Sequence, residues 1–293
     1  MTTSTTVLRL DGGPLSVHRS GDPAAPPVVL LHGAMLDVAP LIWRHLIPAL
    51  AVTRHVIAPD LPRHGGSRPW TGTLDQQRLE GVLDDMLDRL GVARAPFVGL
   101  SMGGGLATGY ALTRPERVSA LVAVNPGGLD DVRPWQFVTW LALRFRPALR
   151  WTMKWLASSA YLRRSMVDAL AEGERTRDFA EVMAMTEAEA RARAAHGEAA
   201  LDDWQITAYG PRRMRLNHLP HLHRLAAPSL WVHGEHDTAV NEAVVRRAAS
   251  LAPGGRYAVV PGAGHLAPLD RPDEVNALVM GLLDEVQPVR RRM

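Results

Sequence analysis

Residues 97–106 read FVGLSMGGGL, an apolar run that breaks at a serine set between glycines. The apolar part predicts a buried strand, and the glycines predict a tight turn into a helix. Gly99 and Gly103 are small enough to let the backbone bend back on itself, which would hold Ser101 in a strained conformation with its hydroxyl group exposed. Ser101 is therefore a candidate nucleophile, although these residues alone also fit a phosphate-binding turn.

Short apolar runs of this kind recur along the chain. A hairpin is expected from strands at 7–10 and 15–19, and five further strands are expected in PPVVLLHG, HVIAPDL, RVSALVAVNP, SLWVHGEHD and RYAVVPGAGH. Helix-period segments lie among them at about 41–51, 74–90 and 272–286. This alternation predicts an α/β fold with a mostly parallel central sheet and helices on both faces.

The ends of the second helix can also be predicted. Thr73 is expected to cap its start, and Gly91 is expected to end it. After the strand in RVSALVAVNP, residues 127–225 are helical in pattern and lack strand-like runs. We interpret this segment as an inserted helical lid, which leaves a core domain made of residues 1–126 and 226–293.

The composition narrows the chemistry. The 293 residues include no Cys, which excludes disulfides, thiolate catalysis and Cys-ligated metals. The net charge is +3, and Lys154 is the only lysine among the basic residues. Because the Arg bias runs through the whole chain, we interpret it as compositional and expect no nucleic-acid partner. Neither a secretory signal nor a membrane-spanning stretch is visible, so a cytoplasmic protein is expected.

A serine nucleophile needs a base, and the base needs an orienting carboxylate, because a neutral hydroxyl reacts poorly. His265 follows the last expected strand, and Asp237 follows the strand before it. The carboxyl ends of parallel strands meet at one edge of a sheet, so both side chains should lie near Ser101. The chain order Ser, Asp, His is also the order that the nucleophile-elbow architecture uses.

Several motifs together give a family resemblance. The LLHG strand end, DLPRHGGS, GLSMGG, HGEHD and GAGH follow one another in the order seen in the alpha/beta-hydrolase superfamily, and the chain resembles its serine hydrolase branch nearly from end to end. The resemblance implies that Ser101 is the nucleophile, His265 the general base and acid, and Asp237 the orienting carboxylate. It also implies an oxyanion hole from the backbone amides of Ala34 and Met102, and it requires no metal or organic cofactor.

Other titratable residues are alternatives to His265 and Asp237. His32 and His64 lie in loop motifs that the superfamily uses for turn geometry, His233 reads as a buried strand-end residue and His236 as an exposed neighbour. Less favoured candidates for the carboxylate that orients His265 are Glu235, Asp202 and Asp203. A cluster of His218, His221 and His223 could in principle bind zinc. Pro220 interrupts the cluster and no carboxylate completes it, so a linker is the preferred interpretation and no metal site is predicted.

Two loops and two single positions indicate which branch of the superfamily the chain resembles. The loop HGAMLDVAPLIW is similar to that of small-molecule esterases and lactonases, whereas VNPGGL is similar to carbon–carbon bond hydrolases of ring-cleavage pathways. Those hydrolases commonly have Asn where this chain has Leu100 and Trp where it has Leu266. Hydrolysis of an ester or lactone is therefore the first prediction. Carbon–carbon hydrolysis, acyl transfer, perhydrolysis and a non-catalytic ligand receptor remain alternatives.

The start of the expected lid is rich in aromatic and basic residues, in RPWQFVTWLALRFRPALRWTMKWLASSAYLRRSM. A helical pair broken near Pro147 is expected here. Its aromatic side chains could form a roof over an apolar substrate pocket, contact a lipid surface, or pack the lid against the core. Met35, Trp135, Trp140 and Leu266 are the expected substrate-binding residues. A small-molecule substrate is expected, and the sequence predicts no oligomeric state.

Overall fold

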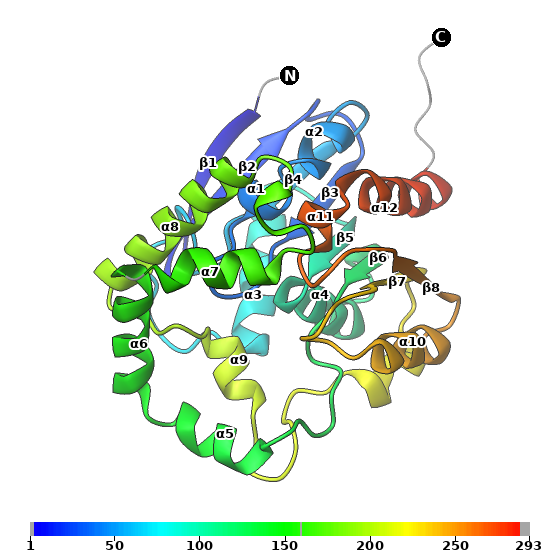
Figure 1. Cartoon of the computed structure of the whole chain (residues 1–293). Helices are drawn as coiled ribbons and strands as arrows, with labels where there is room; N and C mark the ends of the chain where they lie inside the picture. The colour runs from blue at the N-terminus through cyan, green and yellow to red at the C-terminus, as the bar shows by residue number, and fades with distance from the viewer. Residues whose placement is uncertain (1–2, 159, 288–293) are drawn as a thin grey trace.

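The computed structural model describes residues 3–158 and 160–287, which form one eight-stranded sheet in the order β1-β2-β4-β3-β5-β6-β7-β8 (Figure 1). The strands are β1 (Thr3–Leu10), β2 (Gly13–Ser20), β3 (Pro27–Leu31), β4 (His55–Pro59), β5 (Ala95–Leu100), β6 (Val118–Val124), β7 (Ser229–Gly234) and β8 (Gly255–Val260). β2 is antiparallel to both β1 and β4, and the strands from β4 to β8 are parallel. The expected hairpin and mostly parallel sheet are confirmed.

The parallel strands are buried on both faces because successive side chains point to opposite sides of the sheet. In β3, Val29 and Leu31 join one apolar cluster, while Val28 and Leu30 join another. All four side chains are fully buried. A run such as VVLL therefore needs no polar alternation, and it requires helices on both sides.

Helices supply that cover. One cluster receives side chains from α3 (Gln76–Arg89), α4 (Met102–Thr113) and α10 (Glu242–Leu251), and the other from α1 (Ala39–Ile42), α2 (Leu46–Leu50) and α12 (Pro272–Val286). A short helix, α11 (Ala267–Asp270), precedes α12. The helix expected at about 41–51 is thus two short helices separated by a turn.

The start of α3 corrects one expectation. Asp75, and not Thr73, is its N-cap, and the Asp75 carboxylate accepts a hydrogen bond of 2.9 Å from the Arg78 N–H. A carboxylate here satisfies an otherwise unpaired amide of the first turn. Gly91 follows the last turn with a φ of 67°, the left-handed conformation expected of a glycine that ends a helix.

An inserted helical region, residues 125–228, connects β6 to β7. Its helices are α5 (Gln136–Leu143), α6 (Arg146–Ser158), α7 (Tyr161–Ala169), η1 (Gly173–Arg175), α8 (Phe179–Ala195), α9 (Asp203–Ala208) and η2 (Leu219–Arg224). Figure 1 shows α5 to α9 gathered at the left and lower side of the molecule, in front of the sheet. The break between α5 and α6 precedes Pro147, which lies in the first turn of α6, where proline is tolerated. Among the described residues, no helix is long and apolar enough to cross a bilayer.

Candidate active site

The turn between β5 and α4 holds Ser101 in an unusual backbone conformation, with φ 52° and ψ −114°. Such angles are costly for a residue with a side chain and persist only where the surroundings impose them. A Cβ atom on Gly99 would lie 2.3 Å from the Gly103 carbonyl oxygen, and one on Gly103 would lie 2.3 Å from the Leu31 carbonyl oxygen. The two glycines are therefore required by close backbone contacts, as the sequence predicted.

The structure brings the three predicted side chains together. His265 Nε2 lies 3.0 Å from Ser101 Oγ, and His265 Nδ1 lies 2.8 Å from Asp237 Oδ2. Both distances are within hydrogen-bond range. With Nδ1 donating to the carboxylate, Nε2 is left to accept the serine proton, which is the arrangement a general base requires.

Asp237 is held by the loop that carries it. Its Oδ1 accepts hydrogen bonds from the Ala239 and Val240 amides at 2.7 and 3.2 Å, while its side chain is completely buried. The less favoured carboxylates do not lie beside His265. Glu235 accepts from the Gly262 amide, and Asp202 and Asp203 bond to arginines, so none of the three contacts His265.

Asn125 is a residue that the sequence reasoning missed. It follows β6 directly, is fully buried and has a φ of 43°. Its side-chain amide donates to the carbonyl oxygens of Gly264 and His265 at 3.1 and 2.9 Å, and its Oδ1 accepts from the Gly234 amide at 2.9 Å. One side chain therefore fixes the end of β7 and the backbone of the histidine loop relative to each other. The sequence feature that could have indicated its role is an amide side chain directly after an apolar strand.

The loop after β3 places the Ala34 amide beside Ser101 at the cavity. The Gly33 amide donates to Asp37 Oδ2 and the Met35 amide donates to Asp202 Oδ2, both at 2.6 Å. Between them, the Ala34 amide has no acceptor among the residues described. Met102 is the first residue of α4, where amides have no partner within the helix. These two N–H groups match the predicted oxyanion hole, whose role stays a prediction.

His32 braces this loop. Its Nδ1 donates to the Gly33 carbonyl oxygen at 2.7 Å, and its Nε2 accepts from the Leu61 amide at 2.8 Å. Burial, with His64 close by, lowers the pKa of His32 to about 3. The ring is therefore neutral and fully occupied by hydrogen bonds, which suits a structural residue and not a proton carrier.

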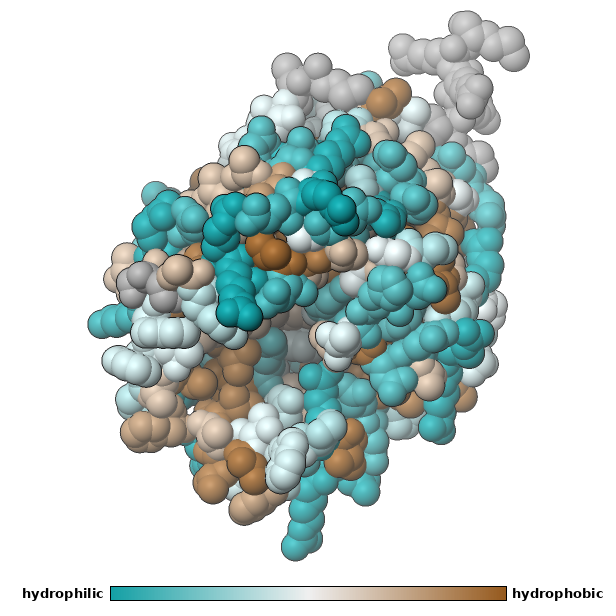
Figure 2. Space-filling model, in the orientation of Figure 1, coloured by the Kyte–Doolittle hydropathy of each residue, from teal (hydrophilic) through white to brown (hydrophobic). Residues whose placement is uncertain are grey.

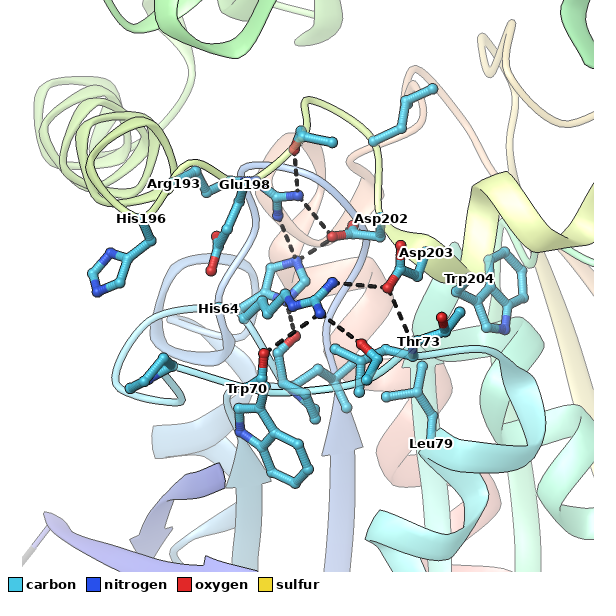
Figure 3. A pocket seen from close by; sticks show the side chains of 18 of the residues that line it. His64, Trp70, Thr73, Leu79, Arg193, His196, Glu198, Asp202, Asp203 and Trp204 are labelled. Carbon is cyan, nitrogen blue, oxygen red and sulfur yellow. Dashed lines mark hydrogen bonds and ion pairs between the residues drawn. The ribbon is translucent and has the colours of Figure 1, made fainter. Parts of the chain in front are cut away.

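A buried ion cluster joins the same loop to the inserted helical region (Figure 3). Arg193 of α8 donates to Asp202 Oδ1 at 2.8 Å and to the Met35 carbonyl oxygen at 2.7 Å, and its guanidinium lies 3.2 Å from His64 Nε2. Burial opposes the charge on Asp202, but Arg193 and His64 outweigh it and hold the pKa of that carboxyl well below its usual value. Met35, with a φ of 67°, is therefore held from both its N–H and its C=O by residues about 160 positions away.

Ser101 and His265 open into a cavity of about 500 Å³, a size suited to a small organic molecule. Met35 and Leu266, two of the expected substrate-binding residues, line it together with Leu143, Leu162 and other residues of the core and the inserted region. Trp135 and Trp140 do not line it. Trp135 is 81% exposed, so the structure places these two expected substrate-binding residues outside the cavity.

A second cavity of about 310 Å³ adjoins the first and shares Leu201 and Trp204 with it. Charged and polar side chains converge on it (Figure 3), whereas apolar side chains such as Leu100, Leu143 and Leu162 line the cavity at Ser101. Asp203 accepts hydrogen bonds there from Arg63 and Arg146 at 2.8 and 2.6 Å. Most of its charges are thus already paired within the protein.

The remaining histidines are spread over other surroundings. His218 is buried, and burial lowers its pKa to about 4, whereas His221 and His223 are exposed on η2. Within residues 3–158 and 160–287, no group of three or more His, Asp or Glu side chains could hold a metal ion. His233 is buried at the end of β7, and the His236 side chain is exposed.

The comparison with protein families agrees with this geometry. A model described as the alpha/beta hydrolase fold matches residues 26–272, which is most of the chain. The chain belongs to the alpha/beta hydrolase family. The resemblance predicted from the motifs is therefore confirmed, and so is the predicted fold with its helical insertion. The boundaries expected for a separate lid, 127–225, stay a prediction.

The relatives of this alpha/beta hydrolase carry different activities. The acetyltransferase component of the acetoin cleaving system from Pseudomonas putida is 28% identical over 90% of this chain, which spans only 65% of that protein. The carboxylesterase YbfK of Bacillus subtilis is 24% identical, over 92% of this chain and 84% of that protein. The enol-lactonase of Burkholderia xenovorans has a similar structure, with a TM-score of 0.69 and 23% identity over 95% of this chain and 99% of that one.

Proposed function

We propose that this chain is a serine hydrolase that cleaves a carboxylic ester or lactone of a small, largely apolar substrate through an acyl-enzyme intermediate. One observation carries the proposal. The Ser101 hydroxyl is hydrogen-bonded to His265, which is hydrogen-bonded to buried Asp237, and the serine faces the cavity of about 500 Å³.

In the first half-reaction, Ser101 Oγ attacks the carbonyl carbon and His265 Nε2 takes the hydroxyl proton. The carbonyl oxygen becomes an oxyanion, to which the Ala34 and Met102 amides donate hydrogen bonds. Collapse of the tetrahedral intermediate breaks the bond to the alcohol oxygen, and His265 returns the proton to that oxygen. Asp237 stabilises the imidazolium that exists between the two proton transfers.

In the second half-reaction, water attacks the acyl group on Ser101 while His265 takes one of its protons. A second oxyanion forms at the same amides and collapses, so that the acid leaves and Oγ recovers its proton from His265. With a lactone, the alcohol formed in the first half-reaction stays covalently attached to the acyl chain. The sum of the two steps is addition of one water across the ester bond.

Two features support ester or lactone cleavage as the first candidate. The apolar cavity has room for an acyl chain beside Ser101, and the carboxylesterase and enol-lactonase relatives act on such bonds. The acetyltransferase relative makes transfer of the acyl group to an acceptor other than water the second candidate. Both share the acyl-enzyme, and they differ in what removes the acyl group from Ser101.

The test measures hydrolysis of p-nitrophenyl esters of increasing acyl length and of simple lactones, with Ser101→Ala as the inactive variant. Removing the nucleophile of such a triad lowers kcat by about 10⁵-fold or more. A fluorophosphonate should add to the wild type once, and peptide mass spectrometry should place the adduct on Ser101. The Ser101→Ala protein, incubated in parallel, is the control for labelling elsewhere.

Two results would count against the proposal. Unlabelled Ser101 under conditions that label a known serine hydrolase would remove the nucleophile assignment. Labelling without release of acid from any ester, combined with product formation when an alcohol or amine is added, would replace hydrolysis by acyl transfer.

A further inference from the structure

The outer side of α5, α6 and α7 carries an unusual density of exposed apolar side chains. Nine of the thirteen large apolar side chains that are strongly exposed among the described residues lie between positions 132 and 161. We call this set the outer apolar patch, and its members are Val132, Trp135, Phe137, Val138, Leu141, Phe145, Trp151, Trp155 and Tyr161. Figure 2 shows apolar side chains gathered over α5 and the neighbouring end of α6, at the lower left of the molecule.

Neighbouring members of the patch lie on common helix faces. Phe137 and Leu141 are four residues apart on α5, and Trp151 and Trp155 are four apart on α6, so each pair lies on one face. The Trp155 and Tyr161 rings are in contact, with centroids 5.4 Å apart. The patch is therefore a series of adjoining surfaces and not a scatter of single residues.

Packing of the inserted region does not explain the patch. Among the described residues of these helices, the buried apolar side chains are Met153 of α6, Leu143 of α5 and Leu162 of α7. Leu143 and Leu162 also line the cavity at Ser101, so the inner faces of α5 and α7 are its wall. The outer faces are apolar in addition to this, which a water-exposed helix does not need.

The charged residues within the segment that carries the patch are all basic. Between Asp131 and Asp168 the chain has seven Arg or Lys residues and no Asp or Glu. Four of these bases form ion pairs with carboxylates outside positions 132–167, namely Arg133, Arg146, Arg163 and Arg164. Arg144 stacks on the Trp140 ring at 5.1 Å, and neither Arg144 nor Arg150 has an ion pair among the described residues.

Such a surface does not suit a second copy of the same chain. A two-fold contact between copies would place these bases against one another without an acidic counterpart. An anionic bilayer surface suits it, because aromatic side chains lie at headgroup level and Arg side chains pair with lipid phosphates. We propose that the outer apolar patch docks this protein on an anionic lipid surface. This binding goes beyond the proposed hydrolysis and does not depend on it.

The test measures cosedimentation of the full chain with vesicles, in the Ser101→Ala background so that no lipid is cleaved. Vesicles of equal parts phosphatidylcholine and phosphatidylglycerol should bind the protein, and vesicles of phosphatidylcholine alone should bind it at least about fivefold more weakly. Raising the salt concentration should weaken binding to the mixed vesicles, because the lipid charge is screened.

Two sets of variants locate the surface. Changing Phe137, Phe145 and Trp151 together to Ser should lower binding to the mixed vesicles at least about tenfold. The matched control changes three exposed apolar residues outside the patch, Val7, Val52 and Leu251, to Ser and should bind as the parent does.

The charge set changes Arg144 and Arg150 to Gln, and its control changes Arg89 and Arg247 to Gln. The first pair should weaken binding about five- to twenty-fold, and the second pair should leave it nearly unchanged. Equal thermal unfolding of variants and parent checks that folding is unaffected, and the arginine pair remains as a test if the aromatic variant misfolds.

The proposal is overturned if the parent protein binds neither vesicle at low salt. Equal losses in the patch variants and their controls would overturn it as well. It also fails if size-exclusion chromatography with light scattering shows a dimer that the aromatic variant loses, because the patch would then be a contact between copies.

Discussion

The sheet edge and the inserted helical region contribute to the site in different ways. At the sheet edge, backbone contacts leave no room for a Cβ atom at Gly99 or Gly103, and they fix the conformation of Ser101. The inserted region lines the cavity with its inner faces and holds the loop after β3 through the buried side chains of Asp202 and Arg193, while its outer side is apolar and exposed. The geometry at Ser101 is thus set by local backbone structure, whereas the cavity wall and the support of the loop after β3 come from residues distant in sequence.

The largest expected effect comes from Gly103→Ala at the sheet edge. The added Cβ would lie 2.3 Å from the Leu31 carbonyl oxygen and 2.5 Å from that of His32, and neither backbone group can move aside alone. We expect loss of about 3 kcal/mol of stability and at least about 10²-fold in kcat/KM.

Gly81→Ala is the control for this change. Gly81 is also helical, but a Cβ there meets no atom within 4 Å, so this variant should be as stable as the wild type or about 0.5–1 kcal/mol more stable. Ester hydrolysis and thermal unfolding measure both variants. If Gly103→Ala behaves like the wild type, the turn between β5 and α4 tolerates a side chain at position 103, and the close backbone contacts do not require glycine there.

An intermediate effect is expected where the two regions meet, from Asp202→Asn. The change leaves the buried Arg193 without its counter-charge and weakens the hydrogen bond that holds the Met35 amide. Stability should fall by about 3 kcal/mol, and kcat by about 10- to 100-fold because the loop that carries the Ala34 amide, the proposed oxyanion donor, is less well held.

The neighbouring Asp203→Asn is a matched control. Asp203 is also buried and paired with two arginines, but it makes no hydrogen bond to the loop after β3 that carries Ala34 and Met35. It should lose stability with little change in kcat when both variants are assayed below their unfolding temperatures. A similar fall in kcat in the two variants would mean that the tie to Met35 has no specific role in turnover.

The smallest effect on turnover is expected from Asp37→Asn, which acts through pH. Burial raises the pKa of Asp37 to about 7, and its Oδ1 is buried without a hydrogen-bond partner among the described residues. The unfolded chain loses this proton near pH 4 and the folded chain near pH 7, so the group lowers stability progressively as pH rises between these values.

The Asn variant removes this dependence. Its stability relative to the wild type should improve by up to a few kcal/mol from about pH 4 to about pH 7 and change little above that. Thermal unfolding across this range measures the difference, with the exposed Asp85→Asn on α3 as control. A relative stability that does not vary with pH would show that Asp37 is ionised throughout.

The parts of the structure with local signals were predictable from the sequence. Apolar runs predicted the strands, and the glycines around Ser101 predicted the turn between β5 and α4. Both structures depend on residues that are neighbours in the sequence. The bonds from Asp202 and Arg193 to Met35 were not predictable, since no spacing pattern links residues about 160 positions apart. Asn125 was missed for the same reason, since its three partners lie at the end of β7 and in the loop that carries His265, more than a hundred positions away.

The orientation of the aromatic segment was also beyond the sequence. QFVTWLAL of α5 carries apolar residues around the whole helix, so its period does not say which face turns inward. Trp135 and Trp140 were expected at the substrate, whereas Thr139 and Leu143 line the cavity. Size and aromaticity alone therefore gave the wrong face.

The adjacency of β6 and β7 has a consequence for how this molecule can be altered. The two strands pair directly, with Val124 opposite Val232, although about a hundred residues separate them in the chain. The Asn125 backbone N–H donates to the Val232 carbonyl oxygen at 2.8 Å, and the Leu121 N–H donates to the Pro228 carbonyl oxygen at 3.0 Å. The start and the end of the insertion are therefore both fixed on neighbouring strands, at opposite ends of the segment over which β6 and β7 pair. Loop closure depends only weakly on loop length. We therefore expect segments of different length and sequence to be tolerated between these strands, which makes this junction a natural position for exchanging the cavity wall while Ser101, His265 and Asp237 keep their places.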